Sequence, residues 1–175
     1  DYTDEEWNDL ISYFQQKDNL NLIYEDPHNF TLNSSSFKAG ERIAEMGACI
    51  NCHFYGAEKP KQDALTWAPN LVLTKERLRP EWLVEWFINP QDVMPGTKMP
   101  APYIPTEEPQ NSIREVWGSD VAKISRDSTK LYKSLIDWMW GMEGRKDVSS
   151  IVKRHLNSQG YGFIIEEEDD WGDEW

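Results

Sequence analysis

Apolar residues recur at helical spacing near the start of the chain, in residues 3–17. Thr3 and Glu6 are three residues apart, as in a capping box, which predicts that a helix begins there. Two interpretations stay open for this helix: it packs on the rest of the chain, or it binds another subunit. The apolar face on which both depend consists of Trp7, Leu10, Ile11 and Phe14.

Similar periodicity predicts further helices after a polar linker over residues 18–36. Gly40 lies inside the first of them. Because glycine in a helix costs about 1 kcal/mol relative to alanine, we expect another helix to approach closely there. Pro80 favours the start of a later helix, and Asn89-Pro90 favours its end. The predicted apolar face of that helix consists of Trp82, Leu83, Trp86 and Phe87. The expected helices cover residues 37–48, 80–88, 113–117 and 128–142.

The sequence Cys49-Ile50-Asn51-Cys52-His53 contains both cysteines of the chain. This spacing is the pattern of covalent haem attachment, in which two thiols bind the vinyl groups and the histidine binds the iron. Redox thiols need no histidine, and a disulfide between residues three apart is geometrically unfavourable. A zinc site needs two further ligands, and the other histidines, His28 and His155, are distant in sequence. We therefore expect one covalent haem c, with zinc or redox thiols as alternatives.

Two proline-containing segments could complete such a site. Pro69 fixes its own backbone, and its carbonyl could accept a hydrogen bond from Nδ1 of His53. The loop Met94-Pro95-Gly96-Thr97-Lys98-Met99-Pro100 holds two methionines between prolines, and a thioether is a soft ligand that suits haem iron. The alternatives are an ordinary loop proline and methionines that fill gaps in the core.

Together these segments resemble the class I mono-haem cytochromes c over residues 34–145. The resemblance implies an all-α cytochrome c fold in which the first and last helices of this domain cross near Gly40. Met99 matches the family's Thr-x-Met-Pro position, whereas Met94 does not. In related proteins a leucine packs on the haem, and Arg and Trp side chains meet its propionates. The haem-binding residues implied are Cys49, Cys52, His53, Pro69, Leu71, Arg79, Trp82 and Met99, with His53 and Met99 as the iron ligands.

Charge and composition limit the kinds of partner and the cellular location that we expect. The 175 residues carry a formal net charge of −13, which argues against nucleic acid or an anionic membrane surface as partner and favours a basic surface or simple solubility. No apolar run approaches the ~18 residues of a membrane span. The first ten residues do not form a signal peptide. Because haem c is attached outside the cytoplasm, we expect a periplasmic or otherwise extracytoplasmic protein whose leader was removed, or a fragment of a longer chain.

The chain differs from small soluble members of that family at both ends. Residues 1–33 form a helical extension and linker, and residues 146–175 form an acidic tail containing Trp171 and Trp175, which is either solvated or anchored on a partner. Such additions favour a non-enzymatic, one-electron transfer subunit of a larger respiratory complex, with redox proteins or other subunits as partners. The alternatives are a free periplasmic carrier, a haem enzyme or gas-binding cytochrome with a labile methionine ligand, and a structural subunit.

Overall fold

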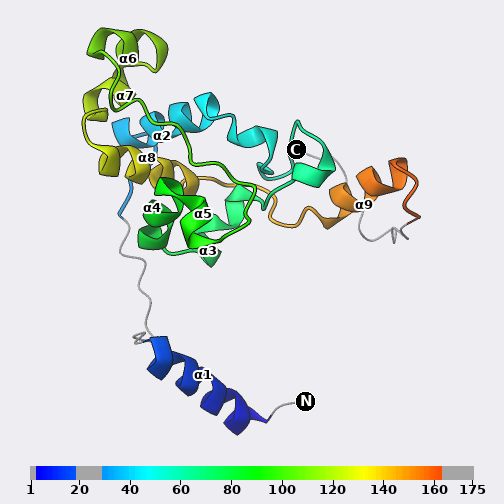
Figure 1. The fold of residues 1–175 in the computed structure, drawn as a ribbon. Coiled ribbons are helices and arrows are strands. Elements are labelled where there is room, and N and C mark those ends of the chain that lie inside the picture. The colour runs from blue at the N-terminus through cyan, green and yellow to red at the C-terminus, as the bar shows by residue number, and fades with distance from the viewer. Residues whose placement is uncertain (1–2, 19–28, 163–175) are drawn as a thin grey trace.

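A computed structural model describes residues 3–18 and 29–162, which are mostly helical (Figure 1). The prediction of an all-α chain is confirmed, because strand-like pairing among these residues is limited to isolated bridges at His53–Ala68 and Tyr55–Glu58. The helices are α1 (Asp4–Asp18), α2 (Ser35–Met46), α3 (Thr74–Arg77), α4 (Pro80–Ile88), α5 (Pro90–Val93), α6 (Gln110–Val116), α7 (Ser119–Ile124), α8 (Ser128–Trp140) and α9 (Ser149–Ser158), with 3-10 turns η1 (Cys49–Asn51), η2 (Ala64–Thr66) and η3 (Leu71–Leu73).

The crossing of α2 and α8 forms the centre of the fold (Figure 1). A Cβ atom added to Gly40 would lie 1.8 Å from the backbone oxygen of Ser134, so the two backbones are in direct contact. The close approach expected at Gly40 is therefore confirmed. Ile43 of α2 and Leu131 and Ile136 of α8 are completely or almost completely buried around this crossing. Helix α8 ends two residues earlier than predicted, with Gly141 as its C-cap.

Helix α4 packs against α8 through the face that the sequence predicts to be apolar. It begins at Pro80 and ends at Ile88, just before Asn89-Pro90, as expected. Leu83 and Phe87 are buried, and the Phe87 ring stacks on Tyr132 of α8 with centroids 6.3 Å apart. This packing fixes the rotation of α4 and hence the direction in which its remaining tryptophans point.

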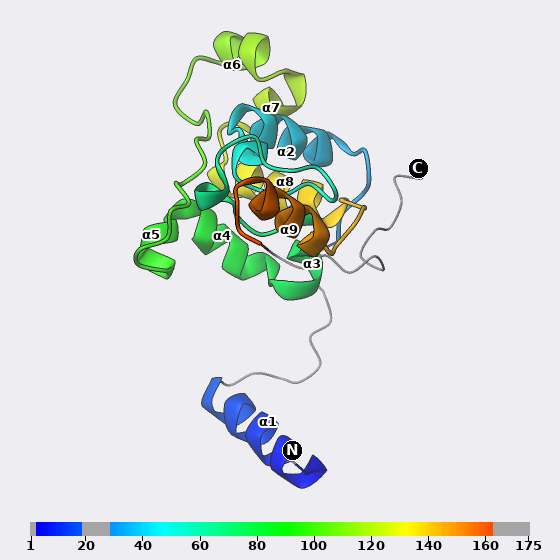
Figure 2. The same cartoon turned by 90° about the vertical axis from the view of Figure 1, so that its right-hand side faces the viewer.

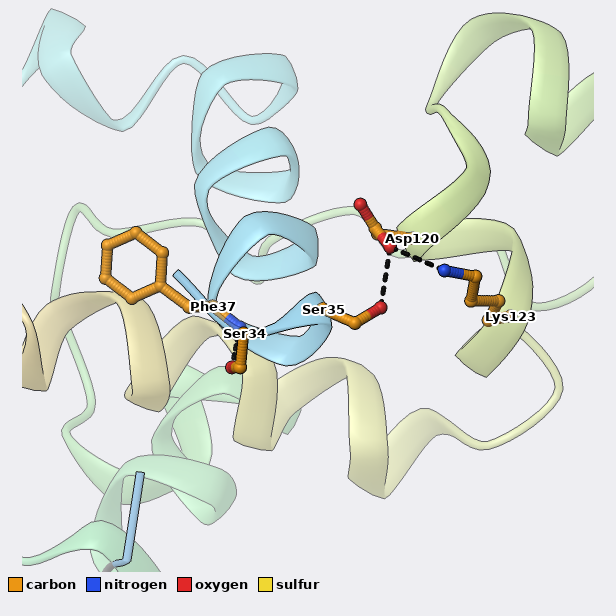
Figure 3. A network of polar contacts seen from close by, with 5 residues as sticks. All are labelled: Ser34, Ser35, Phe37, Asp120 and Lys123. Atoms are coloured by element: carbon orange, nitrogen blue, oxygen red, sulfur yellow. Dashed lines mark hydrogen bonds and ion pairs between the residues drawn. The ribbon is translucent and has the colours of Figure 1, made fainter. Parts of the chain in front are cut away.

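Side-chain contacts anchor the first turn of α2 on α7 (Figure 3). The helix begins at Ser35, two residues before the predicted start, because the Ser34 hydroxyl accepts a hydrogen bond from the backbone N–H of Phe37. Ser35 Oγ donates to Asp120 at 2.6 Å, and Lys123 pairs with the same carboxylate at 2.9 Å. The Ser35 hydrogen bond, followed by that of Lys123, lowers the pKa of Asp120.

The apolar face of α1 lies at the surface. Its N-terminus has the predicted capping box, with Thr3 N–H donating to Glu6 at 2.8 Å. The structure does not support the interpretation in which this face packs on the rest of the chain, since each of its side chains is two-fifths or more exposed. The exposed fractions are 49% for Trp7, 41% for Leu10, 47% for Ile11 and 53% for Phe14.

Helix α9 falls within the range expected to be a tail, where the sequence analysis predicts no helix. It lies on the face that is turned toward the viewer in Figure 2. The His155 ring packs on Trp67, with centroids 4.6 Å apart, so α9 is attached to the segment that leads into Pro69. His28, Trp171 and Trp175 lie outside the described residues. Among the helices that the structure describes, none has the length and apolarity needed to cross a bilayer.

Candidate functional site

The two cysteines and His53 lie on a tight turn directly after α2. Ala48 adopts a left-handed conformation with φ of 53°, which ends the helix and starts the 3-10 turn at Cys49. The backbone N–H of His53 donates to the carbonyl of Cys49 at 2.9 Å, so all three side chains belong to one short hydrogen-bonded unit. Both cysteines are half-buried thiols without a disulfide. Burial raises the pKa of the Cys49 thiol to about 11 and keeps it neutral at pH 7.

The His53 ring is fixed by the carbonyl of Pro69, which lies 2.8 Å from Nδ1. Because a carbonyl oxygen can only accept, Nδ1 must carry the hydrogen, which leaves the Nε2 lone pair for a ligand. Burial lowers the pKa of His53 and outweighs the opposing effect of the Pro69 hydrogen bond, which favours the neutral ring that metals bind. The structure thus contains the contact expected from the sequence.

Asn70 holds the Pro69 segment in place, a role that sequence reasoning missed. Its side chain is only 5% exposed. The amide oxygen accepts from the backbone N–H of Gly56 at 3.1 Å and of Val72 at 3.3 Å. The amide nitrogen donates to the carbonyls of Arg145 at 2.9 Å and Lys146 at 3.2 Å. One buried amide therefore ties the turn after His53 to the chain between α8 and α9.

An apolar cavity of about 330 Å³ lies behind the Pro69 segment. The segment 64–70 forms one wall and α9 with the residues before it forms the other. The contact between His155 and Trp67 attaches α9 to this segment, whose Pro69 carbonyl lies against His53. The lining residues are Phe54, Ala64, Trp67, Ala68, Pro69, Asn70, Val148, Val152 and Leu156.

The remaining predicted site residues gather around α4 and the loop that follows α5. Trp82 and Trp86 are one helical turn apart on α4, and their rings stack at 5.0 Å between centroids, with an interplanar angle of 15°. The indole N–H of Trp86 donates to Sδ of Met99, with 2.9 Å between nitrogen and sulfur. Sequence reasoning placed Trp86 on the apolar face of α4 but missed this contact. Arg79 is an exposed N-cap of the same helix.

The loop that carries Met99 is held by the exposed side chain of Gln91 and by the half-buried side chain of Thr97. The side chain of Gln91 bridges to the Thr97 carbonyl and accepts from the backbone N–H of Gly96 at 3.3 Å. The Thr97 hydroxyl accepts from the backbone N–H of Met99 at 3.3 Å. These contacts direct Met99 toward α4, whereas Met94 stays 55% exposed.

The cysteine turn and the Met99 loop share one hydrophobic core but are not joined by polar contacts. Among the described residues, no hydrogen bond links His53 or either cysteine to Met99. The half-buried side chains of Cys49, Trp82, Trp86 and Met99 nevertheless all pack against the same buried cluster, which includes Leu71. Four of the predicted haem-binding residues, Cys49, Leu71, Trp82 and Met99, therefore belong to or pack against the same core.

The donor types at this site are those with which proteins hold a covalent haem. The site offers two thiols three residues apart, an imidazole whose Nε2 lone pair is left for a ligand, and a thioether in a restrained loop. A zinc site would need further ligands. Within residues 3–18 and 29–162, no cluster of three or more His, Cys, Asp or Glu side chains is arranged to hold a metal ion.

Comparison with known proteins adds no assignment. No family model, curated protein or solved structure matches the chain. The interpretation of the site therefore depends on its own residues and on the contacts described above.

Proposed function

We propose that this chain is a mono-haem c-type cytochrome with a cytochrome c fold, and that it transfers single electrons. The observation that carries the proposal is the hydrogen bond from His53 Nδ1 to the Pro69 carbonyl, directly after the cysteine pair. A structural or redox cysteine pair gives no reason for a histidine whose tautomer is fixed by a dedicated backbone carbonyl. A metal-binding imidazole requires that arrangement, because a partner on one nitrogen orients the other.

In this proposal each residue of the turn has a separate task. The thiols of Cys49 and Cys52 would hold the haem through two thioether bonds, each formed by addition of an S–H across a vinyl group with no atom lost. His53 offers Nε2 as the proximal ligand, and the Pro69 carbonyl raises the basicity of that nitrogen. When bound, the haem supplies a one-electron couple between ferric and ferrous iron. Leu71, buried in the common core, provides apolar contact, and Arg79 and Trp82 remain candidates for the propionates.

Met99 is the proposed distal ligand. Its loop is restrained at Thr97, and its thioether faces α4, whereas Met94 points to solvent. With both axial positions filled by protein, no position is left for a substrate, which favours electron transfer over gas binding or catalysis. The protein takes one electron from a donor protein and gives one to an acceptor.

The surface features favour a role within an assembly, and the proposed attachment of haem c implies a location outside the cytoplasm. An apolar helical face that is two-fifths or more exposed on α1 is suited to cover by another subunit. The net charge of −13 would steer the protein toward basic surfaces. We therefore infer a subunit of a periplasmic or membrane-associated respiratory complex, with redox proteins or other subunits as partners.

The test is expression of the chain together with a haem c attachment system. We expect one haem per chain that resists extraction into acidic organic solvent. In Cys49→Ser and Cys52→Ser variants, each haem should keep one thioether, and the double variant should carry no covalent haem. Attachment that survives loss of both cysteines, or no attachment to the native chain, would overturn the proposal. Zinc analysis of the same samples checks the competing interpretation.

A further inference from the structure

The only polar group of the Trp86 indole, its N–H, donates a hydrogen bond to the thioether of Met99. Tryptophan has one donor, Nε1–H, and when buried it normally finds a strong acceptor such as a carbonyl. Here the partner is a thioether sulfur, a weak acceptor, at 2.9 Å. The contact is half-buried, so water does not readily replace it.

The position of Trp86 is determined by the packing of α4 and not by the methionine. Leu83 and Phe87 on the same helix are 2% and 6% exposed, which fixes the helix against the core. The Trp86 ring is then clamped by its stack on Trp82. Because the tryptophan is held independently, its N–H is a fixed point to which the Met99 side chain adjusts.

We propose that Trp86 is a positioning residue that orients the Met99 thioether and withdraws electron density from its sulfur. This inference depends on the proposed function, in which Met99 is the distal ligand. A thioether sulfur has two lone pairs. The Trp86 N–H occupies one, so the other has a defined direction and reduced donor strength. A weaker sulfur donor stabilises ferric iron less than ferrous iron, so the indole raises the reduction potential.

The contact itself is tested first, on the protein as expressed and kept reduced. The Nε1–H resonance of Trp86 is assigned by its loss in Trp86→Phe. In Met99→Leu, which keeps apolar volume but removes the sulfur, this resonance should shift and exchange faster with solvent. The indole resonance of Trp117, a buried residue at the end of α6, should not move. An unchanged Trp86 resonance in Met99→Leu would overturn the proposal.

The effect on the ligand is tested by redox titration of Trp86→Phe, which preserves a ring to stack on Trp82. We expect a lower reduction potential and a weakened or shifted near-infrared band of ferric methionine ligation. Trp117→Phe is the matched control, since it makes the same chemical change at a ring that packs on Tyr103 and not on Trp82 or Met99, and it should keep the native potential. Equal potentials in both variants would overturn the inference. If no haem is attached, the proposed function fails, and the resonance experiment alone decides whether the Trp86 contact exists.

Discussion

The two sides of the proposed site are held in different ways. His53 is fixed by backbone groups and by the buried amide of Asn70, which binds chain segments about 75 residues apart. The Met99 loop is held by the exposed amide of Gln91 and by two half-buried contacts of Met99 itself, with the Thr97 hydroxyl and the Trp86 indole N–H. A buried hydrogen bond is costly to break because its donor and acceptor are left without any partner, whereas water can replace the partner in an exposed one.

Because of this difference, we expect the free energy of local opening to be higher at His53 than at Met99. The His53 side opens only if the segment around Asn70 comes apart, and that segment is continuous with the core through Val72 and the chain after α8. The Met99 loop can open with its few side-chain contacts while the crossing of α2 and α8 stays intact. Local opening of this kind has a free energy well below that of global unfolding.

The largest expected effect comes from removing the support that both sides share. Gly40→Ala places a methyl group 1.8 Å from the Ser134 carbonyl oxygen, so α2 and α8 must separate. We expect the free energy of unfolding to fall by about 3 kcal/mol or more, because backbone cannot move aside as a side chain can. Denaturant titration followed by circular dichroism measures it. Gly162→Ala, where a Cβ meets nothing within 4 Å, is the control. Near-native stability of Gly40→Ala would show that the crossing is looser than described.

Two matched variants, Asn70→Leu on the His53 side and Gln91→Leu on the Met99 side, then compare the stability that each side contributes. Asn70→Leu keeps the volume but leaves the buried N–H of Gly56 and the carbonyls of Arg145 and Lys146 without this partner. We expect a loss of about 3 kcal/mol in the free energy of unfolding. Gln91→Leu removes an exposed amide and should change stability by less than about 1 kcal/mol. Equal losses in the two variants would contradict the comparison.

How far the sequence predicts this site depends on the distance over which each contact acts. Gly40 is an unusual residue inside a helix, so a local signal is enough to predict the helix crossing. Proline in the segment before Asn70 likewise suggests a free carbonyl for His53. The part played by Asn70 was missed, since an asparagine after a proline is typical of turns and two of its partners, Arg145 and Lys146, lie 75 and 76 residues away.

Two further features were missed for related reasons. Trp86 lies on the apolar face that the sequence predicts, but spacing along a helix says nothing about where an indole N–H points. The sequence of α9 does contain helical periodicity. Two pairs of residues lie one helical turn apart: Ile151 with His155, and Val152 with Leu156. The acidic residues that follow that helix dominated the composition of this region and hid the pattern.

Two truncated chains test whether α9 stabilises the segment that holds His53. Ending the chain after Arg145 removes α9 and exposes Phe54 and Trp67, which we expect to lower the free energy of unfolding by about 2 kcal/mol. Ending it after Tyr161 keeps α9 and serves as the matched control. Identical melting of both truncated proteins would assign α9 no supporting role. Binding of partner proteins, measured on the same pair at two salt concentrations, separates this role from docking.

The smallest effect on stability, and the most informative about the ligands, is expected in the Met99 loop. Met99→Ala removes a half-buried side chain and should lower the free energy of unfolding by about 1 kcal/mol. In the haem-loaded protein it should abolish the near-infrared band of ferric methionine ligation and allow the reduced form to bind carbon monoxide. Met94→Ala, at a position that is 55% exposed, should do neither. The reverse pattern would assign the distal ligand to Met94.

The rate of carbon monoxide binding shows whether the Met99 side opens before the His53 side. In the native protein carbon monoxide should bind slowly, because the Met99 loop must first open. Moderate denaturant should speed this binding before circular dichroism changes, and Gln91→Leu should speed it further without denaturant, since it loosens the loop. Asn70→Leu should instead lower the unfolding midpoint and leave the opening of the loop nearly unchanged. Fast binding by the untreated native protein would mean that Met99 is not a stable ligand, and would favour a gas-binding cytochrome over an electron carrier.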